Sequence, residues 1–71
     1  MDGYSETVSK FLDALCVDLV KDIKYVGKNY RGVCVCGQPI VHGYKFINTR
    51  NHKECLVGKR CLEYVFDYIR N

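Results

Sequence analysis

Residues 34–40 read Cys-Val-Cys-Gly-Gln-Pro-Ile, and residues 54–61 read Glu-Cys-Leu-Val-Gly-Lys-Arg-Cys. Four of the five cysteines of the chain lie in the stretch that these two segments bound. Two cysteines in a tight turn, with another at the start of a helix, are typical ligands of a tetrahedral zinc ion. Gly37 directly follows the pair and favours the positive φ angle that such a turn often needs. The sequence therefore predicts one structural zinc site in this stretch.

The length of the chain favours the same interpretation. Its 71 residues form one domain at most, and a core of this size supplies only about 3–5 kcal/mol of stability. Zinc contributes about 10–16 kcal/mol to small finger peptides, whereas disulfides, the alternative, need an oxidising compartment. Residues 1–6 lack the features of a signal peptide, and no apolar run is long enough to span a membrane. We therefore expect an intracellular protein, in the cytoplasm or nucleus, whose reduced cysteines bind metal.

The charge of the chain is mildly positive, with eleven Lys and Arg residues against eight Asp and Glu residues. A net charge of +3 permits contact with nucleic acid but does not require it. Between residues 24 and 60, Glu54 is the only acidic residue. The basic residues of this stretch are Lys24, Lys28, Arg31, Lys45, Arg50, Lys53, Lys59 and Arg60. The cysteine-rich part is thus the basic half of the chain.

Residues 5–26 carry a helical pattern. Their apolar residues recur every three or four positions, at Val8, Leu12, Leu15, Leu19, Ile23 and Val26. Gly27 would end this helix. We expect its apolar face to cover the core, with Cys16 as a small buried hydrophobic residue. The alternative is that the face binds a partner helix or a second copy of the chain as a homodimer.

The remainder of the chain predicts a knuckle, a hairpin and a second helix. Residues 28–32 have the character of a polar linker, residues 40–48 and 53–57 are rich in strand formers, and residues 48–52 form a polar turn. Gly58 interrupts the second strand, and a helical spacing follows from residue 59 or 60. The helix start favours the thiolate form of Cys61. The predicted fold is a small α+β, zinc-stapled single domain (1–71), with an N-terminal helix (5–26) and a zinc finger (34–70).

The order of knuckle, hairpin and helix resembles a treble-clef zinc finger. More narrowly, Cys34-x-Cys36-Gly37, Ile40, Asn48 and Val57-Gly58-x-x-Cys61 resemble a set of small zinc-finger proteins of phages and large DNA viruses. The resemblance covers about residues 34–66 and implies the fold and the metal more than any activity. The chain departs from that pattern in the first turn of the last helix, where a pair of ligands is expected and only Cys61 is present.

The fourth zinc ligand is left open by the sequence. Cys34, Cys36 and Cys61 are the first three, and Cys55 is our choice for the fourth because thiolate is the commonest donor in structural sites. His42 is the alternative. If residues 48 and 53 pair across the turn, Phe46 faces Cys55 and His42 approaches Lys59. His52 lies at the distal turn and is expected to be solvated.

The sequence contains no pattern that predicts an enzyme. A site closed by sulfur ligands leaves no open position for catalysis, and the chain has no phosphate-binding loop or paired-carboxylate motif. We therefore expect a non-enzymatic regulatory module that binds nucleic acid. One alternative is a protein-interaction module or inhibitor, such as a viral regulator, that binds a host or viral protein. The other is an ordinary solvated basic surface. The predicted nucleic-acid contacts are Lys45, Arg50, Lys53, Lys59 and Arg60 for phosphates, and Tyr30 and Tyr44 for stacking.

Overall fold

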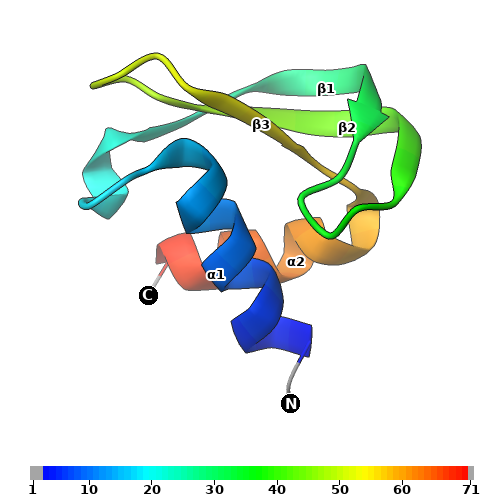
Figure 1. The fold of residues 1–71 in the computed structure, drawn as a ribbon, viewed down its shortest axis with the longest axis horizontal. Helices are drawn as coiled ribbons and strands as arrows, with labels where there is room; N and C mark the ends of the chain where they lie inside the picture. Colours follow the sequence, from blue (N-terminus) through cyan, green and yellow to red (C-terminus); the bar gives the residue numbers. More distant parts are fainter. Residues whose placement is uncertain (1–2, 71) are drawn as a thin grey trace.

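Two helices pack against one face of a three-stranded antiparallel sheet (Figure 1). The computed structural model describes residues 3–70. The sheet has the strand order β1-β2-β3, and both helices lie on the same side of it. This arrangement confirms a small α+β domain with a helix near each end and a hairpin between them. It leaves the other face of the sheet without a covering helix among the described residues.

The first helix, α1 (Gly3–Leu15), is shorter than predicted. It buries Val8, Phe11 and Leu15, so its apolar face covers the core as expected. The chain leaves the helical conformation at Cys16, which adopts a left-handed φ of 50°. The prediction that Cys16 is buried in the helix face is wrong, because its side chain is exposed beyond the end of the helix.

The second half of the predicted helix is a strand. After a short 3₁₀ turn, η1 (Val20–Asp22), strand β1 (Ile23–Val33) takes the place of both the end of the helix and the predicted polar linker. It pairs with β2 from Ile23 opposite Asn48 to Val33 opposite Pro39. The prediction failed because the apolar spacing matches a helical period, whereas pairing with the next strand along the chain decides the conformation of this segment.

The hairpin and the last helix were predicted correctly. Strand β2 (Pro39–Asn48) and strand β3 (Glu54–Val57) are antiparallel, and Phe46 lies opposite Cys55 as the predicted register requires. The last helix, α2 (Lys59–Arg70), begins directly after Gly58. Its first turn therefore lies at the same end of the sheet as the loop between β1 and β2 (Figure 1).

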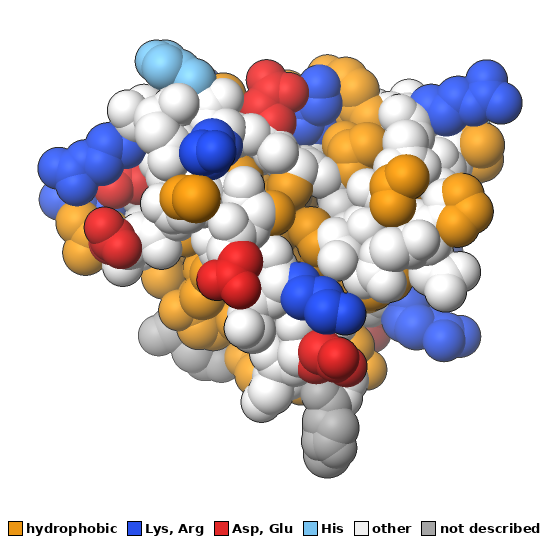
Figure 2. Space-filling model, in the orientation of Figure 1, with side chains coloured by type: hydrophobic (Ala, Val, Ile, Leu, Met, Phe, Trp, Pro, Cys, Tyr) orange, Lys and Arg blue, Asp and Glu red, His pale blue; other side chains and the backbone are white. Residues whose placement is uncertain are grey.

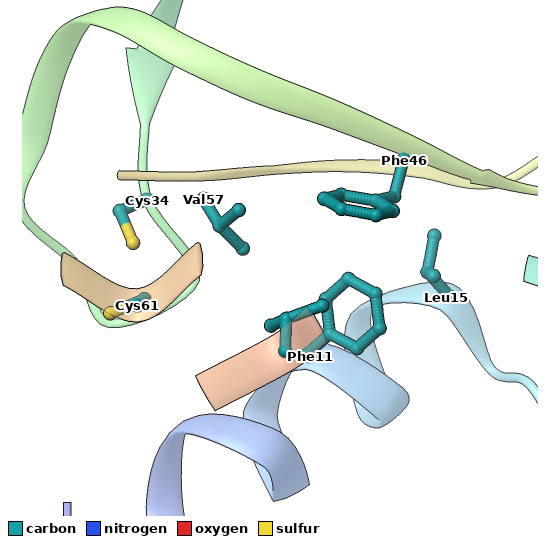
Figure 3. Packing of buried hydrophobic residues seen from close by; sticks show 7 residues of the cluster. Phe11, Leu15, Cys34, Phe46, Val57 and Cys61 are labelled. Carbon is teal, nitrogen blue, oxygen red and sulfur yellow. The ribbon is translucent and has the colours of Figure 1, made fainter. Parts of the chain in front are cut away.

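The hydrophobic core lies between the sheet and the two helices. Phe11 of α1 and Phe46 of β2 meet edge to face, with ring centroids 5.2 Å apart (Figure 3). Both rings are almost completely buried, as is Val65 of α2, and each such side chain contributes about 1.5–3 kcal/mol by leaving water. Cys34 and Cys61 lie at one end of this cluster, beside Val57 (Figure 3).

A buried asparagine connects the hairpin to α1. The Asn48 side chain is 2 % exposed, and its Nδ2 donates to the backbone oxygens of Leu15 at 3.0 Å and Cys16 at 3.4 Å. Asn51 Nδ2 donates to the same Leu15 oxygen at 3.1 Å. These bonds satisfy carbonyl groups that the helix end leaves without intrahelical donors. The hairpin turn therefore caps the C-terminal end of α1.

Candidate metal centre

The loop between β1 and β2 forms the predicted cysteine knuckle. The backbone N–H of Cys34 donates to the Gln38 oxygen at 2.8 Å, and the N–H of Gly37 donates to the Cys34 oxygen at 2.8 Å. Gly37 has a φ of +94°, which confirms the expected need for glycine at this position. The loop is also fixed to β3, because the Val35 N–H donates to the Leu56 oxygen at 3.0 Å. The two knuckle cysteines are thus held in a defined turn beside the sheet.

The first turn of α2 brings a third cysteine to this knuckle. The sulfur atoms of Cys34, Cys36 and Cys61 all lie within 4.8 Å of one another. In an ideal tetrahedral site with Zn–S bonds of about 2.3 Å, the sulfurs are about 3.8 Å apart. Displacements of about 1 Å would therefore bring the three cysteines to ligand geometry. The donor set is soft and fits zinc or another thiolate-binding metal.

Hydrogen bonds to two of the sulfurs resemble those that support metal-bound thiolates. The Gly58 N–H donates to Cys34 Sγ at 3.2 Å. The backbone amide of Gln38 is the main cause that lowers the pKa of Cys36 below its usual value. Since a hydrogen bond donated to sulfur stabilises its anionic form, the Gln38 amide favours the state of Cys36 that binds metal.

The pKa of the third cysteine, Cys61, is shifted in the opposite direction from that of Cys36. Burial raises the pKa of Cys61 to about 12, and the neighbouring Cys34 thiol adds to the shift. Thr7 of α1 is its only hydroxyl contact among the described hydrogen bonds, with Oγ1 3.9 Å from Cys61 Sγ. In the metal-free chain, the raised pKa therefore favours the neutral thiol of Cys61, in contrast to the expectation from the helix start. A bound cation would reverse this balance.

The two predicted candidates for the fourth ligand lie outside the three-sulfur group of residues 3–70. Cys55 lies opposite Phe46, so its side chain projects from the face of the sheet that packs on the core. Burial raises the pKa of Cys55 to about 12, which favours a neutral thiol in the core. His42 is exposed on β2. It does not reach a partner near Lys59, because β3 ends at Val57 and the chain turns into α2.

A cavity of about 690 Å³ adjoins the cysteine group. All three cysteines line it, and its remaining walls come from α1, the knuckle and the start of α2. The polar side chains among these walls are Thr7, Gln38, Lys59, Arg60 and Tyr64. Sequence reasoning missed Thr7, because it lies far from the cysteines in the chain. It also missed Tyr64, although its position three residues after Cys61 was a usable signal.

The predicted nucleic-acid contacts do not form one surface. Lys45 lies over the Tyr30 ring, 4.2 Å from its centroid, on the face of the sheet opposite the helices. Arg50, Lys53 and the exposed His52 belong to the β2–β3 turn and its flank. The other two basic residues, Lys59 and Arg60, lie beside the cysteines at the opposite end of the sheet. Figure 2 accordingly shows Lys and Arg side chains dispersed among acidic and neutral groups.

Two of the predicted contacts are engaged within the molecule. Lys45 Nζ also lies 3.2 Å from Glu54 Oε1, so Glu54 offsets part of its charge. Tyr44 pairs with Val57, a core residue, and its ring lies 6.5 Å from that of Tyr25. Tyr44 therefore projects toward the helices, on the opposite face from Tyr30 and Lys45.

Comparison of the chain with protein-family models, with characterised proteins and with solved structures gives no match. The resemblance to treble-clef proteins of phages and viruses thus stays a prediction from the quoted residues. Within residues 3–70, neither helix has the length and apolar character needed to cross a membrane.

Proposed function

We propose that the chain is a non-enzymatic module that binds one structural Zn²⁺ through Cys34, Cys36 and Cys61. The observation that carries this proposal is the convergence of three sulfurs within 4.8 Å from two elements that are separate in sequence. The two backbone amides directed at Cys34 and Cys36 support it further. Zinc would join the end of β1 to the start of α2 and so close one end of the domain.

Metal analysis of the purified, reduced protein tests the site. We expect one zinc per chain and a markedly lower melting temperature after removal of the metal by a chelator, because a core of this size supplies only about 3–5 kcal/mol on its own. Circular dichroism during a thermal melt measures the effect. An identical melt with and without metal would contradict the proposal.

We further propose that the module binds single-stranded nucleic acid on its outer sheet face, which we define by Lys24, Tyr30 and Lys45. Two features support this surface. No described helix covers it, and it places the Tyr30 ring directly beside the Lys45 side chain. Lys24 lies opposite Ile47, on the same face as Lys45. Stacking on the ring together with phosphate contacts to the lysines is a common way to bind single strands.

A fluorescence anisotropy titration at several salt concentrations tests this second proposal. Replacing Lys24 and Lys45 together by Ala should reduce the slope of log K against log salt by up to about 1.4, since each phosphate contact on a single strand contributes about 0.7. The matched control is Lys10→Ala, because Lys10 lies on α1 in the other layer. If the slope of log K against log salt falls instead in the variant Lys59→Ala/Arg60→Ala, the phosphate contacts lie at the cysteine end of the sheet and not on its outer face.

Glu54→Gln provides a test by gain of function. The substitution removes the carboxylate that pairs with Lys45 and should strengthen binding by up to about fivefold, because exposed ion pairs are worth at most about 1 kcal/mol. Binding that is absent at low salt for single-stranded DNA, single-stranded RNA and duplex DNA would refute the nucleic-acid proposal.

A protein partner is the second candidate function, and one observation favours it. Val33 and Val41 are 60 % and 56 % exposed on neighbouring strands, which is unusual for such apolar side chains. This candidate would be supported if the chain retains a protein partner, if Val33→Ser and Val41→Ser abolish that retention, and if the chain binds no nucleic acid.

A further inference from the structure

Tyr64 of α2 lines the same cavity as the three cysteines. It lies three residues after Cys61, and residues at this spacing share one face of a helix. Both side chains line the same cavity of about 690 Å³. A Cys or His at position 64 would therefore face the three sulfurs and close the site, whereas tyrosine is not among the usual ligands of structural zinc.

The other walls of this cavity would suit an incoming anionic donor. Lys59 and Arg60 line it from the first turn of α2, where the positive end of the helix dipole also lies. Three thiolates and one Zn²⁺ carry a net charge of −1, so a further anion needs cationic neighbours to offset its charge. These two side chains and the helix start provide them.

From this juxtaposition we infer that the metal centre keeps one coordination position facing the Tyr64 cavity and takes an external thiolate there. The inference rests on the proposed zinc site. Thiolate is the favoured donor because it matches the softness of the other three ligands. The incoming thiol would lose its proton to solvent and add its sulfur as fourth donor. It could be a small thiol or a cysteine of a partner protein, and the two sources are separable by experiment.

Cobalt replacement gives a direct readout of the number of sulfur ligands. The thiolate-to-cobalt charge-transfer absorption of the Co²⁺-loaded protein should rise by about one third when 2-mercaptoethanol is added, since three sulfur donors become four. Tyr64→Cys should show the higher absorption from the start and should not respond to the added thiol. The tripeptide Gly-Cys-Gly, with Gly-Ser-Gly as control, tests the second source. Tighter binding of the cysteine tripeptide than of 2-mercaptoethanol would indicate a protein-borne ligand.

Three controls keep the result interpretable. The exposed Cys16 of a second copy of the chain could also supply a sulfur donor. Cys16→Ala should respond to added thiol as the unaltered chain does, and this result would exclude that source. Tyr64→Phe should also leave the starting spectrum unchanged, and a change would show that the tyrosine itself is a ligand and overturn the inference. Cys55→Ser should likewise leave the starting absorption unchanged.

Two outcomes would refute different claims. If the unaltered chain already matches Tyr64→Cys and added thiol changes nothing, the fourth donor is internal and the inference is wrong. If the unaltered chain shows no charge-transfer absorption with Co²⁺, the proposed metal site itself is wrong. The first outcome leaves the metal site intact, so the two failures are distinguishable.

Discussion

Replacing Asn48 with alanine should destabilise the domain far more than its place in a surface turn suggests. Asn48 Nδ2 donates to the Leu15 and Cys16 oxygens, and its Oδ1 accepts the Arg50 N–H at 2.9 Å. Each such bond contributes about 1 kcal/mol net, and a buried group left without a partner costs about 1–3 kcal/mol. Since Asn51 still donates to the Leu15 oxygen, we expect a loss of about 2–3 kcal/mol in the free energy of unfolding.

Urea denaturation of the zinc-loaded protein measures this loss. The matched control is Asn51→Ala, which removes a part-buried hydrogen bond to the same Leu15 oxygen and an exposed one from the Lys53 N–H. Because the Asn51 side chain is itself exposed, this variant should cost only about 1 kcal/mol. The double variant should cost more than the sum, because the Leu15 oxygen then loses both side-chain donors. An Asn48→Ala loss no larger than that of Asn51→Ala would refute the argument that the buried amide connects the hairpin to α1.

The remaining predictions concern the cysteines. Serine at any one of the three proposed ligands, Cys34, Cys36 or Cys61, should abolish tight zinc binding in a competition titration. The control Cys16→Ala should leave zinc affinity unchanged. Full zinc affinity in any ligand variant would show that the replaced residue is not a ligand. In alkylation followed by mass spectrometry, Cys16 should react with or without zinc, Cys36 should react only after metal removal, and Cys55 should react slowly in both states because burial raises its pKa to about 12. A thiol whose pKa rises from 9.0 to about 12 on folding contributes stability that is complete below pH 9 and is lost as pH rises through about 12. The urea midpoint of the metal-free chain should thus fall between pH 8 and pH 11 by less in Cys55→Ala than in the unaltered chain, and an equal fall in both would contradict this role of Cys55.

The parts of the fold that were predictable carry local signals. The hairpin was predicted with its register because a polar turn separates two short runs of strand formers, and pairing residues 48 and 53 then places Phe46 opposite Cys55. The last helix was predicted because Gly58 and a strong apolar period mark its start. The tight turn of the knuckle followed from Gly37 in the same way.

The segment after Leu15 was not predictable from its own periodicity. Leu19, Ile23 and Val26 continue the helical spacing, yet in the structure Leu19 and Val26 are 44 % and 45 % exposed. Only Ile23 of the three packs against the core. The conformation of β1 is decided by its pairing with β2, from Ile23 opposite Asn48 to Val33 opposite Pro39, and this pairing leaves no periodic pattern in the sequence of β1.

The candidate metal centre likewise combines features that were predictable from the sequence with features that were not. The three sulfurs were predictable because Cys-x-Cys and the helix start are local patterns, whereas the surroundings that determine their chemistry are not. Thr7 approaches Cys61 from a helix 54 residues away in sequence, and the burial that raises the pKa of Cys61 depends on that packing. The choice of Cys55 as fourth ligand rested on donor type and on its place in the strand that leads into α2, and it did not consider which face of the sheet the side chain occupies. The same register that correctly placed it opposite Phe46 also assigns it to the core-facing side of the sheet.

The two ends of the sheet are held by different chemistry. At the β2–β3 turn, neutral amides of Asn48 and Asn51 bind the end of α1, and these bonds need no cofactor. At the knuckle, three thiols converge from two elements that are separate in sequence, and burial opposes the ionisation of Cys61. Because a divalent cation removes that opposition and binds all three sulfurs at once, metal occupancy should act mainly on the knuckle end. That end also holds the Tyr64 cavity, so the same cation would both stabilise the fold and present the position at which an external ligand could bind.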